Sequence, residues 1–166
     1  MTAEEVIRHL HLTPLALEGG FFRETYRSRS NFAAESLPEQ YRGPRSLATA
    51  IYYLITPQTF STLHRVPGTE VFHFYMGDPV VMLQLGRDGV ARTITLGNDL
   101  ARGHEPQVVV RGRVWQGCRL AVGGKWALLG TTMSPGFDYA DYETGDRETL
   151  SAKFPNAAAL IRQYTK

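Results

Sequence analysis

The chain has a single cysteine and no long apolar segment, and each absence excludes a class of protein. Cys118 has no partner for an internal disulfide, and its apolar, strand-like surroundings predict a buried, unreactive thiol. No apolar run approaches the roughly 20 residues that a membrane helix needs, so no membrane contact is expected. The first residues include Glu4, Glu5 and Arg8, which a secretory signal would not contain. We therefore expect a cytoplasmic protein.

Charge of one sign is also scarce. The formal net charge is only +2 over 166 residues, and the basic residues are scattered. Arg23, Arg27 and Arg29 alternate along one segment, but acidic residues such as Glu24 lie among them. A nucleic-acid-binding surface needs a concentrated basic face. Nucleic acid is therefore not an expected partner.

Short, evenly spaced strands dominate the predicted secondary structure, separated by Gly, Pro, Asn and Asp. The predicted strands cover residues 21–28, 48–54, 60–66, 70–75, 80–85, 91–96, 107–110, 118–122 and 126–132. A helix over residues 2–10 should be capped by Thr2, with Glu5 three residues later. A second helix, over residues 154–161, should be capped near Asn156. The pattern predicts an all-β sandwich or barrel with helical ends, in one domain spanning residues 1–166.

The stretch from His64 to Gly77 carries the most specific motif. Six residues separate Glu70 from Gly77. His64 lies N-terminal to Glu70, at the place where the first histidine of the motif is found. This spacing resembles the first metal-binding motif of cupin barrels, which reads His-x-His, three or four residues, Glu, six residues, Gly. Val66 stands where that motif has its second histidine. The stretch thus resembles a cupin pocket that has lost part of its metal-binding set.

The second cupin motif is similar to residues 110–115, where Trp115 replaces the metal-binding histidine. Indole cannot ligate a metal, because its N–H only donates. His64 and Glu70 alone are too few for a transition-metal site, which normally has at least three protein ligands. His73 is the tempting substitute, but strand alternation turns it away from the face of Glu70. No metal and no other cofactor is therefore predicted; His64, Glu70 and His73 would be the ligands if there were one.

Several segments together resemble one family over nearly the full chain. They are residues 19–26, 46–54, 61–65, 70–74, 115–116 and 134–138. The family is the cupin superfamily 5 type, formerly a domain of unknown function (DUF985). The resemblance implies a double-stranded β-helix, or jelly roll, that forms a homodimer. It also implies structural similarity to germins and to dTDP-sugar epimerases, which need no metal and use a His base and a Tyr acid.

His64 is the predicted general base, because an imidazole pKa of about 6.5 suits proton abstraction beside a carbonyl. Glu70 would orient it or stabilise its charge. The alternative is that His64 and Glu70 are a buried hydrogen-bonded pair left over from a metal site. Both interpretations stay open at this point.

Six further residues are predicted to contact a ligand. Trp115 would stack on a sugar or another planar group, or else simply fill the cavity. Arg23 is preferred over Glu24 as an anchor for an anion, since alternation puts the two on opposite faces. The remaining four are Tyr53 as a candidate acid, Phe72 beside Glu70, Gln84 as a polar group on an apolar strand, and Phe137 as a lid at the barrel mouth.

Three functions follow as hypotheses. The first is a metal-independent cupin that binds a small polar metabolite, such as a sugar or nucleotide-sugar, and epimerises or isomerises it. The second is a non-catalytic binding or sensor protein. The third is a metal-dependent cupin enzyme, which would need His73 to face the cavity. A shared fold cannot choose between them, because cupins support many unrelated chemistries.

Overall fold

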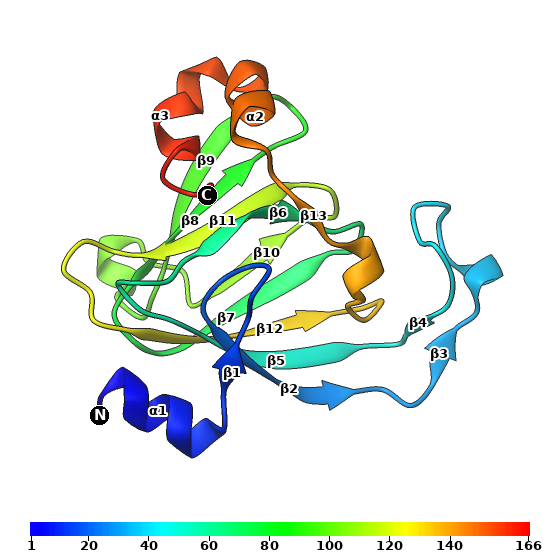
Figure 1. The fold of residues 1–166 in the computed structure, drawn as a ribbon, viewed down its shortest axis with the longest axis horizontal. Helices are drawn as coiled ribbons and strands as arrows, with labels where there is room; N and C mark the ends of the chain where they lie inside the picture. Colours follow the sequence, from blue (N-terminus) through cyan, green and yellow to red (C-terminus); the bar gives the residue numbers. More distant parts are fainter.

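The computed structural model describes all 166 residues and consists mainly of two antiparallel sheets that face each other (Figure 1). The six-stranded sheet has the order β1 (Thr13–Pro14), β2 (Phe21–Arg27), β5 (Thr49–Ile55), β12 (Ala127–Met133), β7 (Glu70–Gly77) and β10 (Gln107–Val110). The five-stranded sheet has the order β13 (Glu143–Thr144), β6 (Ser61–Arg65), β11 (Trp115–Leu120), β8 (Val80–Leu85) and β9 (Ala91–Leu96). A small ribbon of β3 (Asn31–Phe32) and β4 (Arg45–Ser46) extends to one side. The predicted all-β jelly roll is confirmed.

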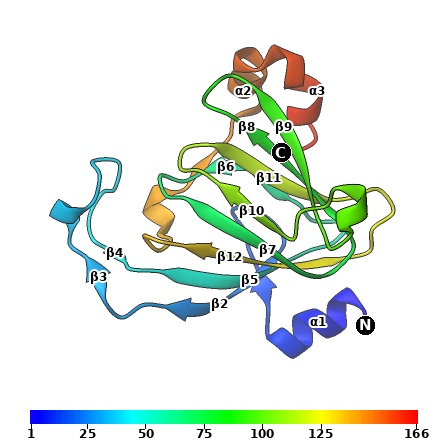
Figure 2. The same cartoon turned by 180° about the vertical axis from the view of Figure 1, so that it is seen from behind.

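Helices are confined to the ends of the chain and to short connections. The α-helices are α1 (Ala3–Leu10), α2 (Arg147–Lys153) and α3 (Ala158–Ile161). The 3₁₀ turns are Ala34–Ser36, Leu100–Arg102, Tyr139–Asp141 and Pro155–Ala157. Figure 2 shows α2 and α3 together beside the five-stranded sheet, with α1 on the opposite side of the molecule. None of these helices has the length and apolar character needed to cross a membrane.

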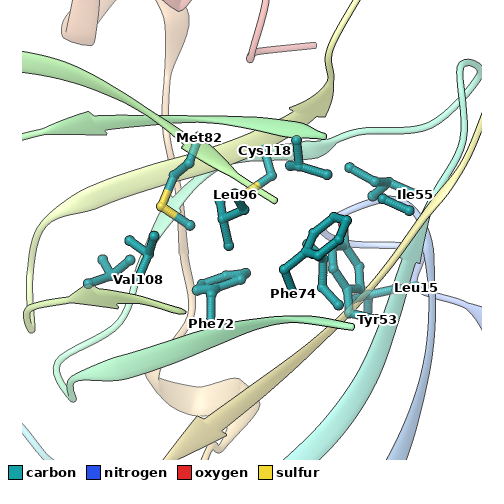
Figure 3. Close-up of a cluster of buried hydrophobic side chains, with 13 residues drawn as sticks. Leu15, Tyr53, Ile55, Phe72, Phe74, Met82, Leu96, Val108 and Cys118 are labelled. Atoms are coloured by element: carbon teal, nitrogen blue, oxygen red, sulfur yellow. The ribbon is translucent and has the colours of Figure 1, made fainter. Parts of the chain in front are cut away.

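The main core lies between the two sheets, where inward-facing side chains of both meet (Figure 3). Tyr53 on β5 and Phe72 on β7 point from one sheet toward Met82 on β8 and Cys118 on β11. Alternation along each strand produces this arrangement, since every second side chain points to the same face. Cys118 is fully buried, and burial raises the pKa of its thiol well above the usual value. This agrees with the expected unreactive thiol.

The outer face of the five-stranded sheet is also buried. Leu63, Leu85 and Trp115 pack there against Leu150 of α2 and Ile161 of α3. The outer face of the six-stranded sheet is covered only in part, where Ala3 and Val6 of α1 contact Leu54 and Leu128. The five-stranded sheet is therefore covered on both faces. The six-stranded sheet is covered on its inner face and on a small part of its outer face.

The strand predictions differ from the structure mainly at one strand start. The predicted strands 80–85, 91–96 and 107–110 coincide with β8, β9 and β10. β11, however, begins at Trp115 and not at Cys118. Trp115 and Gln116 therefore lie within a strand, where successive side chains point to opposite faces.

The helix predictions were correct at the N-terminus and incomplete at the C-terminus. Thr2 and Glu5 form the expected reciprocal cap of α1. At the other end, α2 was missed, although Asp146 caps it through the N–H of Thr149. No side chain caps the following turns, so the predicted cap near Asn156 was wrong.

Replacing Thr2 with alanine should lower the free energy of unfolding by about 1 kcal/mol, the usual value of such a cap. Urea unfolding followed by circular dichroism measures it. Thr2→Ser keeps the hydroxyl and should leave stability within about 0.5 kcal/mol of wild type. Equal losses in both variants would mean that the cap contributes nothing.

Candidate functional site

A cavity of about 80 Å³ lies beside the core between the sheets. Strands β2, β5, β6, β7 and β12 form its walls, together with the segment before β2 and the segment after β12. Its polar lining residues are Glu18, Glu24, Arg27, Thr49, His64, Glu70, Thr131, Tyr139 and Tyr142. Its apolar ones are Leu15, Leu17, Phe22, Ile51, Val66, Met133 and Phe137. Such a mixture of apolar walls and a few converging polar groups is typical of small-molecule sites.

A buried hydrogen-bonded cluster joins His64, Glu70 and Gln116. The side-chain nitrogen Nε2 of Gln116 lies 2.8 Å from Nε2 of His64 and donates to Oε2 of Glu70 at 3.1 Å. Nδ1 of His64 lies 2.7 Å from the carbonyl oxygen of Thr62, which can only accept. The hydrogen-bond network thus assigns the ring proton to Nδ1 and leaves Nε2 as the acceptor of the Gln116 amide. Both ring nitrogens of His64 are engaged.

The carboxyl of Glu70 has a strongly raised pKa. The pKa of its carboxyl is raised to about 7, mainly by burial; His64 and a hydrogen bond with Thr131 act against this shift, and the charge of Glu18 adds to it. At neutral pH the carboxyl therefore exists in both protonation states, as a group that gives and takes protons must.

Glu18 was not predicted from the sequence. Its carboxylate accepts a hydrogen bond of 2.6 Å from Ser61, and its other oxygen lies 3.9 Å from Nε2 of His64. The glycines that follow it take positive φ angles, 104° at Gly19 and 75° at Gly20, which turn the chain back against β5 and β6. A single acidic residue in an apolar run before Gly-Gly is the only signal that the sequence offers.

Residues 137–142, here called the strap, close one side of the cavity. The ring of Tyr142 stacks on the ring of His64, with centroids 4.8 Å apart and an interplanar angle of 22°. Its hydroxyl is buried without a hydrogen-bond partner, and burial raises its pKa, so it stays protonated. Asp141 anchors the strap through two bonds to Arg45, of 2.6 and 2.8 Å.

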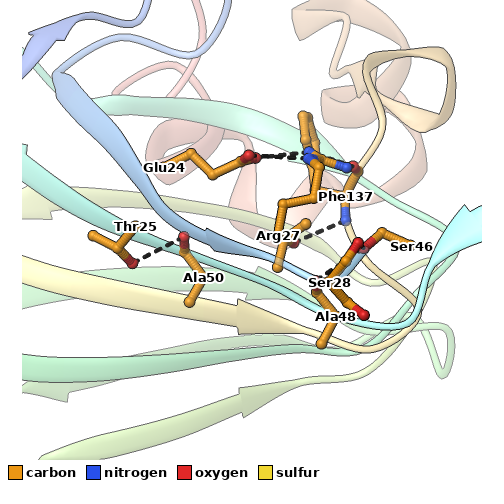
Figure 4. A network of polar contacts seen from close by, with 9 residues as sticks. Glu24, Thr25, Arg27, Ser28, Ser46, Ala48, Ala50 and Phe137 are labelled. Atoms are coloured by element: carbon orange, nitrogen blue, oxygen red, sulfur yellow. Dashed lines mark hydrogen bonds and ion pairs between the residues drawn. The ribbon is translucent and has the colours of Figure 1, made fainter. Parts of the chain in front are cut away.

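The only cation that lines the cavity is already neutralised. Arg27 forms a two-bond ion pair with Glu24, at 2.7 and 2.9 Å, and also donates to the carbonyl oxygen of Phe137 in the strap (Figure 4). Glu18 and Glu70 have no Lys or Arg partner in the cavity. The interior therefore disfavours an anionic ligand and suits hydroxyl or ammonium groups.

The structure places Arg23 outside the cavity, contrary to the expectation. Arg23 is opposite Tyr52 on β5, and its guanidinium lies 5.5 Å from the centre of that ring. Glu24 is opposite Ile51 instead, on the face that lines the cavity. The alternation argument was correct that only one of the two could reach inside, but it selected the wrong one.

The structure also places Trp115 outside the cavity. The side chain of Trp115 points to the outer face with Leu85, because alternation from Cys118 in the core turns Gln116 inward beside His64. Arg65 covers the outward-facing ring of Trp115, with its guanidinium 4.4 Å from the centre of that ring. Trp115 thus stacks on a side chain and not on a cavity ligand, and Gln116 is the polar residue that sequence reasoning missed.

The other predicted ligand contacts divide between the core and the cavity. Phe72 is buried in the core, as is Tyr53, whose hydroxyl donates to the carbonyl oxygen of Gly19 at 2.9 Å. Gln84 lies on the inner face, opposite Gln116, but bonds to the sulfur of Met82 and does not line the cavity. Phe137 does line it, as part of the strap.

His73 faces away from Glu70, as alternation predicts. It contacts Thr132 at 3.0 Å and Gln107 at 3.3 Å on the outer side of the six-stranded sheet. Nowhere do three His, Cys, Asp or Glu side chains converge in a way that could hold a metal ion. Both nitrogens of His64 also already have partners. The residues present therefore do not fit a resident transition metal.

Two solved structures are similar to this one over their full length. A hypothetical protein from Leishmania major shares 30% identity, with 99% of both chains covered and a TM-score of 0.89. A protein from Shewanella oneidensis also shares 30% identity, with 100% of this chain and 98% of the other covered and a TM-score of 0.88. No curated protein matches the chain.

A more distant similarity supports the fold alone. Oxalate decarboxylase from Bacillus subtilis shares 13% identity and a TM-score of 0.53, and the match covers 89% of this chain and 35% of the other.

The family model described as cupin superfamily (DUF985) matches residues 4–145. The chain therefore belongs to the DUF985 family of the cupin superfamily.

Proposed function

We propose that this cupin binds a small, hydroxyl-rich metabolite without a metal ion and isomerises it by proton transfer through Glu70. The observation that carries the proposal is the Glu70 carboxyl: it lines the cavity, it is buried, and its pKa is raised to about 7. A carboxyl poised in this way can remove a proton from a carbon beside a carbonyl and return it.

His64 and Gln116 then act as positioning residues for Glu70. Gln116 holds one oxygen of Glu70, and His64 holds Gln116 through the nitrogen that a base would need to have free. Tyr142, with its protonated and unpaired hydroxyl, is the candidate acid on the other side of His64. This division moves the base from His64, where the sequence suggested it, to Glu70.

The size of the cavity favours a small ligand. Sites for drug-sized ligands usually enclose about 300–1,000 Å³, and this cavity has about 80 Å³. A small hydroxylated carbonyl compound matches that volume better than a whole nucleotide-sugar. The nucleotide of such a ligand would have to lie outside the cavity.

The test combines ligand screening with isotope exchange. Polyols, small sugars and hydroxy ketones are screened by thermal shift, and hits are incubated with the protein in D₂O. We expect NMR to show deuterium at one carbon of the ligand, and His64→Gln to slow this exchange about tenfold, because Gln116 loses its anchor. Exchange at the wild-type rate in His64→Gln would remove His64 from the site.

The alternative is a binding or sensor protein that performs no chemistry. The small, enclosed cavity favours it as well, because ligand recognition needs no free base. This alternative predicts saturable binding with no deuterium in the ligand, and binding that survives His64→Gln. The same experiment therefore separates the two functions.

A further inference from the structure

A second hollow lies on the other side of the strap and has the opposite charge character. This groove has a volume of about 500 Å³ and is open to solvent. Three arginines from three separate segments line it: Arg42 before β4, Arg65 at the end of β6 and Arg113 between β10 and β11. The groove shares Val66 and Tyr142 with the cavity, so the two hollows are neighbours.

Two of these arginines have no acidic partner. Arg65 forms a two-bond ion pair with Glu143, at 2.7 and 2.8 Å, and Asp141 is occupied by Arg45. Arg42 and Arg113 form no ion pair and are exposed. Both carboxylates that line the groove are therefore already paired with an arginine. The positive charges of Arg42 and Arg113 have no acidic partner.

The backbone holds Arg113 in place at a conformational cost. Its φ is 66°, in the left-handed region that non-glycine residues seldom adopt. Its N–H donates to the carbonyl oxygen of Val66 at 2.8 Å. Gly112 packs so closely on Pro67 that a side chain there would collide with the Pro67 backbone. The turn is thus fixed against the end of β6, which keeps Arg113 next to Arg65.

Arg65 is fixed as well. Its guanidinium is held between Glu143 and the face of Trp115, 4.4 Å from the ring centre. Both hydrogen bonds to Glu143 use Nε and Nη2, which leaves Nη1 free. A rigid guanidinium with free N–H groups loses little entropy when it binds phosphate oxygens, which it matches in geometry.

We propose that this groove is an anion site that binds the phosphoryl groups of a phosphorylated ligand. Arg42 and Arg113 supply the charge, and Arg65 supplies an ordered donor. The neighbouring cavity lacks a free cation, so the groove is the better site for a charged group and the cavity for an uncharged one. A hydroxylated group would enter the cavity and its phosphate would lie in the groove, with Tyr142 between them; this last step rests on the proposed function.

Inorganic pyrophosphate and a nucleoside diphosphate are the probes, titrated by calorimetry at low and at physiological ionic strength. We expect saturable binding of at least one of them, and a dissociation constant raised about tenfold or more in the double variant Arg42→Gln/Arg113→Gln. Arg111→Gln is the matched control: Arg111 lies in the same turn and is exposed but does not line the groove. At physiological ionic strength it should change the dissociation constant less than about twofold, because its charge is screened and its side chain does not line the groove.

Two results would overturn the proposal. One is that neither probe binds saturably to the wild-type protein. The other is that Arg111→Gln weakens binding as much as the double variant does, which would mean a diffuse charge effect. Thermal unfolding without ligand checks that the variants are folded. Glu70→Gln should leave pyrophosphate binding unchanged, so failure of the groove is distinguishable from failure of the proton-transfer site.

Discussion

Replacing Glu70 with glutamine should abolish proton exchange on the ligand and remove the loss of stability that Glu70 causes as the pH rises. Glutamine keeps the shape and the hydrogen bond from Gln116 but cannot take up a proton. Loss of a positioned acid–base group typically lowers the rate at least about 100-fold. Deuterium incorporation, measured by NMR at equal ligand saturation, gives this ratio.

The stability effect follows from the direction of the pKa shift. In the folded protein the pKa of Glu70 is about 7, above its usual value of 4.5, so the folded state holds this proton more tightly than the unfolded state. Glu70 therefore costs nothing below about pH 4.5 and destabilises progressively until the pH exceeds about 7, by roughly 3 kcal/mol in total. Glu70→Gln should remove this loss, so that the variant is more stable than wild type at about pH 8.

Urea unfolding at about pH 5 and pH 8 checks this effect, with Glu35→Gln as the control. Glu35 is exposed and has no hydrogen bond or ion pair, so its replacement should leave the pH response unchanged. If the stability difference between Glu70→Gln and wild type is the same at both pH values, Glu70 is not the group that titrates near neutral pH.

Replacing Asp141 with asparagine should destabilise the protein by about 3 kcal/mol, because it leaves a buried cation without its partner. The side chains of Arg45 and Asp141 are each only 5% exposed. Arg45 keeps its bonds to the carbonyl oxygens of Gly43 and Pro44, which neutralise no charge. Because Asp141 anchors the strap next to Tyr142, ligand binding in the cavity should weaken as well. Chemical unfolding and thermal shift with a ligand measure the two effects.

The surface pair of Asp88 and Arg92 provides the control. It has a similar length of 2.6 Å but side chains that are about half exposed. Asp88→Asn should cost much less than Asp141→Asn, because solvent screens the exposed pair. A further variant, Arg45→Met/Asp141→Leu, removes both charges and should recover most of the stability that Asp141→Asn loses. Similar losses in Asp141→Asn and Asp88→Asn would show that burial does not make the first pair special.

Much of the fold could be predicted from the sequence because its signals are local. Alternation and turn residues locate most strands within one or two residues, and Thr2 with Glu5 marks the first helix. The error at Trp115 has a local cause too. Its position in the motif predicts Trp115 in the cavity, whereas alternation from Cys118, which faces the core, turns Gln116 inward and Trp115 outward.

The rest of the site could not be predicted because it depends on contacts between distant parts of the chain. Glu18 and Tyr142 both meet His64, but they lie on opposite sides of it in the sequence and in no regular strand. Their roles come from the glycine turn before β2 and from the buried anchor of the strap. Motif spacing contains no information on either.

The enclosure of one sheet on both faces has a consequence for mutational tolerance. In β6, β8 and β11 most side chains are buried regardless of parity, since one face meets the core and the other meets α2 and α3. In β7 and β10 burial alternates with exposure. A saturation scan should therefore find few positions that tolerate substitution in β6, β8 and β11. In β7 and β10, about every second position should tolerate it. Spectroscopic labels or surface mutations belong at positions such as Val71 and Val109, on the open face.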